Sequence, residues 1–283
     1  MFKRILVPLD GSGLAERALP VAARLARASG GSITFVRVIG TTPASSPSAP
    51  GRPNLVQPSN EADQLLAASY LEGVKATDDL RGIYVKTEVS VGLIAPIILS
   101  LAASSLTDII VMCSHGFTGV TRWMMGSVAE KVARYADVPV LILRAGGSIP
   151  TEQLHHESEG PRILVPLDGS QNAEAALQPA ASLATALSVS GKGALHLLHV
   201  VTDDDSTGGN MARKYLDAII HDGATITQET DLNLTLTAST VINKDVAHAI
   251  VHTAEQGAPG EGQHFDVIAL STHGYGGLQR WVT

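Results

Sequence analysis

The sequence predicts an α/β protein made of two tandem open parallel-sheet sandwiches, and an internal duplication is the first reason. The segment RILVPLDGS at Arg4–Ser12 recurs without change at Arg162–Ser170. A second pair, SHGFTGVTRW from Ser114 and THGYGGLQRW from Thr272, has the same separation of 158 positions. Solenoid repeats are about 20 to 50 residues long, so a repeat of this length indicates a duplicated domain.

The duplication fixes the expected domain bounds. We expect domain 1 over residues 1–146, a polar linker over residues 147–160 and domain 2 over residues 161–283. The linker has no apolar periodicity, which is typical of a loop.

The second reason is the alternation of strand and helix patterns within the first copy. Short β-branched runs predict strands at Ile5–Leu9, Ile33–Ile39, Val85–Val91, Asp108–Met112 and Val138–Leu143. Apolar spacings near 3.6 predict helices at Ala15–Ala28, Glu61–Leu80, Ile94–Ala103 and Val128–Tyr135. Such alternation requires right-handed crossovers, and ligands of such sheets bind at the carboxyl ends of the strands.

Composition limits the class of function. The net charge of −7 and the isoelectric point near 5.8 argue against nucleic-acid binding, which needs a basic face. Cys113 is the single cysteine, so a reducing cytosol is the expected compartment. The longest apolar run, Val91–Ala103, is interrupted by Pro96 and is shorter than the roughly 20 residues of a membrane span. We therefore expect a soluble cytoplasmic protein that binds neither membrane nor nucleic acid.

The common catalytic and phosphate-binding motifs are missing. The sequence contains no GxxxxGK[ST], GxSxG or HExxH. Gly11 and Gly13 follow the first strand, but Glu16 stands where the third glycine of GxGxxG would be.

A different glycine spacing follows the fourth strand: Cys113-Ser-His-Gly116, then nine residues, then Gly126-Ser127. Together with VPLDGS, this segment resembles the universal stress protein family. The family motif has a glycine in place of Cys113, and the resemblance covers nearly the whole chain in two copies. It implies the adenine nucleotide alpha hydrolase-like (Rossmann-like) fold type, strand order 3-2-1-4-5, and binding of ATP, or of ADP or AMP.

The resemblance also implies the site residues. It places the phosphates at Cys113, Gly116, Gly126, Ser127 and Val128, because glycines let amides approach a phosphate and a helix begins at Ser127. The alternative is that Ser127 and Glu130 form a capping box, which needs no ligand.

The adenosine is expected beside Pro8, Asp10, Val38 and Met112. Asp10 is the candidate Mg²⁺ ligand, or else it forms an Asp-Gly turn with Ser12 as the next helix cap. The alternative to adenosine contact for Val38 and Met112 is that both are ordinary core residues at the ends of their strands. Three roles are open for Cys113. Its side chain narrows the phosphate cleft, it acts as a redox sensor, or it is a buried and inert small side chain.

The second copy departs further from the motif. Its last residue, Thr283, corresponds to Met125, so it has no counterpart of Gly126, Ser127, the last helix or the fifth strand. We expect one tightly bound nucleotide per chain, in domain 1. The resemblance also implies a homodimer through the edge strand Val138–Leu143.

Three functions remain open at this point. The first is a stress-response or signalling module controlled by ATP occupancy, and the others are a weak ATP hydrolase and a nucleotide-free dimerisation scaffold. Binding is favoured over catalysis, because only Arg122 and Asp10 offer charge near the motif.

Overall fold

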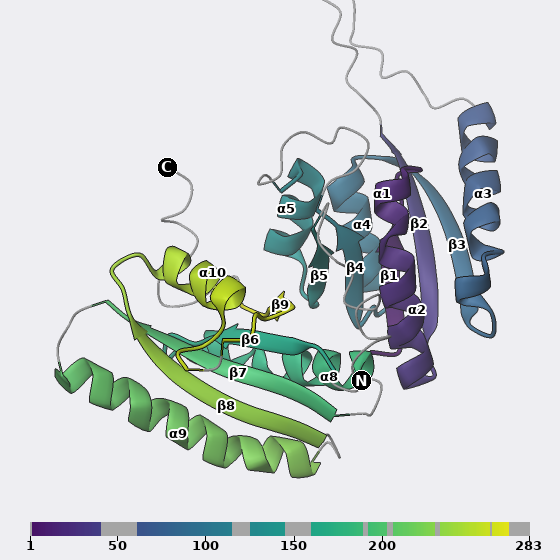
Figure 1. Ribbon diagram of the computed structural model, residues 1–283. Coiled ribbons are helices and arrows are strands. Elements are labelled where there is room, and N and C mark those ends of the chain that lie inside the picture. Colours follow the sequence, from purple (N-terminus) through teal and green to yellow (C-terminus); the bar gives the residue numbers. More distant parts are fainter. Residues whose placement is uncertain are drawn as a thin grey trace, which may run out of the picture. The chain divides into compact units, whose positions relative to one another are not determined.

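The computed structural model describes residues 2–40, 61–114, 125–144, 160–188, 192–202, 206–229, 233–260 and 262–271. The chain divides into two compact units, Phe2–Ile149 and Pro150–Thr283, each with its own sheet (Figure 1). Within the described ranges, no helix combines the length and the hydropathy needed to cross a bilayer. The predicted linker, residues 147–160, lies outside the described residues except for Gly160.

The first unit has a five-stranded parallel sheet in the order β3-β2-β1-β4-β5, so the predicted fold class is confirmed. The central strand β1 is an uninterrupted apolar run because helices cover both of its faces. Its residues Ile5, Leu6 and Val7 are at most 1% exposed. The strands are β1 (Arg4–Pro8), β2 (Ser32–Gly40), β3 (Tyr84–Gly92), β4 (Ile109–Cys113) and β5 (Val140–Leu143).

The helices of this unit pack on the two faces of the sheet. On the face of the sheet that α4 and α5 cover, these two helices form a core with Leu6, Val36 and Ile110. The other helices contact the sheet elsewhere, α2 along β1 and β4 and α3 along β2 and β3 (Figure 1). The helices are α1 (Gly13–Glu16), α2 (Ala18–Ser29), α3 (Glu61–Lys75), α4 (Ile94–Ser104) and α5 (Ser127–Tyr135), with a 3₁₀ helix η1 (Asp78–Leu80).

The single helix predicted over Ala15–Ala28 is wrong in one respect, because the structure divides it into α1 and α2 at Arg17. Pro20 explains the break, since it has no N–H to donate to the carbonyl of Glu16. Proline fits instead in the first turn of a new helix. The second unit has the same break, with Pro179 in the first turn of the following helix.

Two other predicted bounds were too wide. The helix expected to reach Leu80 ends at Lys75, because Thr77 is extended (φ −68°, ψ 149°) and the chain restarts as η1. Strand β5 begins at Val140 rather than Val138, since Pro139 has no N–H for a sheet hydrogen bond.

The second unit repeats the arrangement with four described strands, in the order β8-β7-β6-β9. Its core on the α10 face includes Leu164, Leu198 and Phe265. The elements are β6 (Arg162–Pro166), α7 (Gln171–Glu174), α8 (Leu177–Leu187), β7 (Lys192–Val201), α9 (Ser206–Glu229), β8 (Asn233–Ile242), α10 (Val246–Gln256) and β9 (Val267–Ile268).

Equivalent positions in the two units do not keep one offset along the chain. Arg4 pairs with Ser32 and Arg162 with Ala194, so β7 lies 162 positions after β2 (32 to 194). Ile5 pairs with Ile109 and Ile163 with Val267, so the offset returns to 158 at β4 and β9 (109 to 267). The sheet register, rather than a fixed offset, therefore identifies counterparts.

Candidate functional site

The turn after β1 is the first part of the candidate site. Asp10 Oδ1 accepts hydrogen bonds from Ser12 N at 3.0 Å and Ser12 Oγ at 2.6 Å. Ser12 Oγ in turn accepts from Ala15 N at 3.1 Å and caps α1. Gly11 has φ +85°, a conformation that favours glycine. The predicted Asp-Gly turn and Ser12 cap are confirmed.

The second unit builds the same turn after β6. Asp168 Oδ1 accepts from Ser170 N at 3.0 Å and Ser170 Oγ at 2.6 Å, and Gly169 has φ +85°. Ser170 Oγ accepts from Ala173 N at 3.1 Å. The duplicated LDGS sequence therefore has a local structural role in both units.

The end of β4 forms the second part of the candidate site. Cys113 is 8% exposed, and its Sγ lies 3.9 Å from the Ala15 carbonyl oxygen. Burial raises the pKa of this thiol to about 11, although the charge of Arg17 opposes the shift. The interpretation of Cys113 as a buried, unreactive side chain fits this environment, and a redox sensor does not.

The beginning of α5 is held against the end of β4. Gly126 N donates to the Ser114 carbonyl at 2.7 Å, and Ser114 N donates to the Leu143 carbonyl at 2.8 Å. The structure therefore brings Cys113 and Ser114 close to Gly126 and Ser127. Gly116 and Arg122 lie outside the described residues.

The capping-box alternative for α5 is wrong. The N-cap residue is Gly126 (φ −64°, ψ 147°), and no side chain caps the helix. Ser127 is the first helical residue instead, because Glu130 N donates to the Gly126 carbonyl at 2.9 Å. The first backbone amides of α5 therefore have no side-chain cap and no partner within the helix. They include the amides of Ser127 and Val128.

The apolar residues expected beside adenosine lie on one face of the sheet. Met112 is 6% exposed in the core between the sheet, α4 and α5, and Val38 packs against that core. Pro8 is half-buried at the end of β1. Both Val38 and Met112 therefore contribute to the core, and any ligand contact would use only their exposed edges.

A polar cluster that the sequence analysis missed lies beside the first turn. The Tyr70 hydroxyl donates to Glu16 Oε1 at 3.0 Å, and Arg37 Cζ lies 5.2 Å from the centre of the Tyr70 ring. Burial and the Glu16 carboxylate raise the pKa of Tyr70. In the second unit the Tyr215 hydroxyl donates to Glu174 Oε1 at 2.9 Å.

No fixed offset relates the members of these two clusters. Glu16 and Glu174 are 158 positions apart, whereas Tyr70 and Tyr215 are 145 apart. A repeat search at one offset therefore cannot pair them, and the shared Tyr–Glu hydrogen bond is the signal that does.

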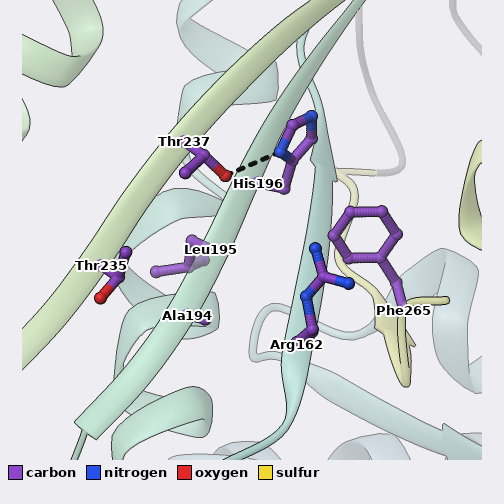
Figure 2. Close-up of a pocket in the computed structure, with 7 residues that line it drawn as sticks. All are labelled: Arg162, Ala194, Leu195, His196, Thr235, Thr237 and Phe265. Carbon is purple, nitrogen blue, oxygen red and sulfur yellow. Dashed lines mark hydrogen bonds between the residues drawn. The ribbon is translucent and has the colours of Figure 1, made fainter. Parts of the chain in front are cut away.

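A small pocket lies elsewhere in the second unit, at the amino-terminal ends of its strands (Figure 2). Its volume is about 130 Å³, below the roughly 300 Å³ at which ligand sites begin. His196 is 3% exposed there, with its Nδ1 2.7 Å from Thr237 Oγ1 and its Nε2 2.8 Å from Ser239 Oγ. Arg162 Cζ lies 4.6 Å from the centre of the Phe265 ring. We interpret the pocket as a packing feature, since it is small and its polar groups have partners.

Comparisons with known proteins define the class. The sequence pattern of the universal stress protein family matches residues 1–144 and 161–283. The chain belongs to the universal stress protein family, and it carries that domain twice.

The comparisons also give individual proteins to which this chain is similar. A universal stress protein of Methanocaldococcus jannaschii is 30% identical over 144 residues, which cover 51% of this chain and 83% of the relative. The crystal structure of a universal stress protein from Archaeoglobus fulgidus has a TM-score of 0.59 and 20% identity, and the match covers 89% of this chain and 81% of that one. The match to an Archaeoglobus fulgidus universal stress protein in complex with dAMP covers 50% of this chain and 97% of that one, with 23% identity and a TM-score of 0.37.

Proposed function

We propose that the first unit binds an adenine nucleotide, ATP first and ADP or AMP as alternatives, and that occupancy regulates a stress-response or signalling role. The phosphates would lie against the amides of Ser127 and Val128, with Gly116, Gly126 and the backbone of Cys113 lining the approach. The adenosine would contact Pro8, Asp10, Val38 and Met112.

The observation that carries the proposal is the uncapped beginning of α5 at the carboxyl edge of the sheet. Its N-cap is a glycine with no side chain to satisfy the first amides. The hydrogen bond from Gly126 N to the Ser114 carbonyl holds that helix end beside β4. Amides at a positive helix end favour a phosphate, and this position is next to the switch between β1 and β4.

The replacement of the family glycine by Cys113 is compatible with the proposal. The Cys113 side chain is buried with its sulfur toward the Ala15 carbonyl. A side chain packed in that direction leaves the backbone of β4 as the surface that meets the ligand.

Asp10 fits a supporting role for Mg²⁺. Mg²⁺ commonly takes one or two carboxylates and completes its shell with phosphate oxygens and waters. The described residues contain no group of three or more His, Cys, Asp or Glu that could hold a metal by themselves. In this proposal the ion arrives with the nucleotide, and Asp10 supplies one carboxylate oxygen.

The proposal favours binding over hydrolysis, because phosphoryl transfer needs several positioned charges and a base. It also includes a cytoplasmic location, which suits the single cysteine, and a homodimer formed through β5. That strand is at the edge of the first sheet, where unpaired backbone groups can recruit a second strand.

Calorimetric titration of Mg·ATP into the wild type and Gly126→Asp tests the phosphate site. An aspartate at an N-cap accepts hydrogen bonds from the helix amides, so the variant should keep α5 folded while its carboxylate competes with phosphate. We expect affinity to fall roughly tenfold or more.

Gly73→Asp is the matched control. Gly73 is an exposed α3 residue with open space around its Cα, so this variant adds the same charge away from the site. Equal ATP affinity in the wild type and Gly126→Asp would eliminate α5 as the phosphate site.

A further inference from the structure

Two buried nitrogen atoms without hydrogen-bond partners occupy equivalent places in the two units. They are Arg37 Nη1 and His199 Nδ1, found among the residues that the structure describes. Pro8 pairs with Val36 and Pro166 with Leu198, so Arg37 and His199 each follow the counterpart residue of β2 and β7. Leaving a buried polar nitrogen unpaired is costly, so its recurrence singles out this position in both units.

The surroundings of these two nitrogens are also equivalent. Each side chain packs against a tyrosine, with Arg37 Cζ 5.2 Å from the Tyr70 ring centre and the His199 and Tyr215 ring centres 5.9 Å apart. Each tyrosine donates to a glutamate. The two clusters therefore differ mainly in the basic residue itself.

Only the arginine reaches the glycine of the turn after the first strand. A Cβ on Gly11 would overlap Arg37 Nη1 and lie 3.1 Å from Arg37 Cζ. A Cβ on Gly169 would have no atom within 4 Å, so His199 does not reach that glycine. The guanidinium thus lies directly behind the Asp10–Gly11 turn, which is part of the proposed nucleotide site.

The difference between Arg37 and His199 also changes the charge at the carboxyl edge of the sheet in each unit. In the first unit the charges of Asp10, Glu16 and Arg37 all act on Tyr70, and arginine contributes the positive one. In the second unit the charges of Asp168 and Glu174 act on Tyr215 in the same way. Burial lowers the pKa of His199, although the Asp168 charge and the Leu167 backbone oppose the shift. At neutral pH the first edge therefore carries one more positive charge than the second.

We propose that Arg37 is the residue that makes the first unit select anionic nucleotides over uncharged nucleosides. Its guanidinium, held against Gly11, supplies a fixed positive charge close to the proposed site, and this charge attracts the anionic oxygens of a bound nucleotide. The second unit, with His199, lacks this charge and would not discriminate in the same way. This inference rests on the proposed nucleotide binding, and it adds a specificity residue to that site.

The test compares a charged and an uncharged ligand. Mg·ATP and adenosine are titrated into the full chain as wild type, Arg37→Met and Arg37→Lys, each at low and high salt. Methionine keeps the packing against Tyr70 but removes the charge, whereas lysine keeps the charge. We expect Arg37→Met to lose roughly tenfold in ATP affinity and less than about twofold in adenosine affinity. Arg37→Lys should recover most of the preference for ATP.

Arg81→Met is the matched control, since Arg81 is an exposed arginine of the same unit that pairs with Asp78. Its ATP and adenosine affinities should match those of the wild type. Added salt should weaken ATP binding in the wild type, because it screens the charge of Arg37. The same salt should weaken ATP binding less in Arg37→Met, which lacks that charge.

The outcomes separate this inference from the proposed function. If the wild type binds ATP and Arg37→Met keeps the full preference for ATP over adenosine, the role of Arg37 is overturned while nucleotide binding stands. Equal losses for ATP and adenosine would make Arg37 only structural. A wild type that binds neither ligand would overturn both proposals.

Discussion

Asp10 accepts two hydrogen bonds from Ser12 through a single carboxylate oxygen, Oδ1, at 3.0 Å from the backbone nitrogen and 2.6 Å from Oγ. The same hydroxyl of Ser12 caps α1 by accepting from Ala15 N. One serine therefore fixes both the carboxylate orientation and the beginning of the helix.

Ser12→Ala should destabilise the first unit by about 1 to 2 kcal/mol, because it removes the cap and one bond to Asp10. Ser170→Ala removes the same contacts in the second unit and should cost a similar amount there. Hydrogen exchange of peptides from each unit, measured by mass spectrometry, gives the two values in one molecule. Protection unchanged in β1 after Ser12→Ala would contradict the structural role.

Gly11→Ala and Gly169→Ala form a second matched pair. Both glycines have φ +85°, so both variants should incur roughly 1 to 2 kcal/mol of backbone strain. Only the Cβ at residue 11 meets Arg37, so Gly11→Ala should cost more. Chemical denaturation followed by hydrogen exchange of peptides from each unit measures how much more Gly11→Ala costs than Gly169→Ala. The double variant Gly11→Ala with Arg37→Ala should remove that extra cost. Equal costs for the two single variants would mean that Arg37 moves aside freely.

Cys113 should react slowly with alkylating reagents in the native protein. With a pKa of about 11, about one thiol in a thousand is ionised near pH 8, and the side chain is 8% exposed. Labelling by iodoacetamide, followed by intact mass, should therefore track urea unfolding of the first unit. Complete labelling of the folded protein within minutes would contradict the buried environment.

The second unit should lose stability on acidification through His199. Burial lowers the pKa of this side chain below its unfolded value, so below a pH of about 6.5 the unfolded state binds more protons. Protection of β6 and β7 should therefore fall as pH decreases from that value toward the lower native pKa. His199→Gln should flatten the pH dependence of this protection. His252→Gln changes an exposed residue of α10 and should leave the pH dependence unchanged.

The edge strand β5 should mediate a homodimer. The Pro139 carbonyl accepts from Ile110 N of β4, and the Leu143 carbonyl accepts from Ser114 N just after β4. Val140 and Ile142 therefore direct their backbone groups away from β4. Ile142→Pro removes an outward donor without breaking a bond to β4, and it should shift the mass measured by light scattering toward the monomer. Ile142→Val keeps the donor and is the control. A wild type that is strictly monomeric at micromolar concentration would refute the dimer.

The sheet was predictable because its strands are apolar runs separated by helical patterns, and residues such as Leu6 and Ile110 must be buried. The capping of α5 was not, since Gly126 and Ser127 are both acceptable N-cap residues and only the extended conformation of Gly126 decides between them. The cluster of Arg37 and Tyr70 was not predictable either. Its members come from separate elements, and its counterparts in the second unit are displaced by different numbers of residues.

The first strand of each unit lies in the middle of its sheet, and this position affects the order of synthesis. The Asp108 carboxylate accepts from Arg4 N, and the Asp266 carboxylate from Arg162 N, so each contact joins residues 104 positions apart. At about 5 to 20 residues per second, the ribosome takes roughly 5 to 20 seconds to supply the later residue after the earlier one. During that interval β1 has no neighbour on its β4 side, so the backbone edge that later pairs with β4 stays unpaired. The nascent chain passes through this exposed stage twice, once for each unit.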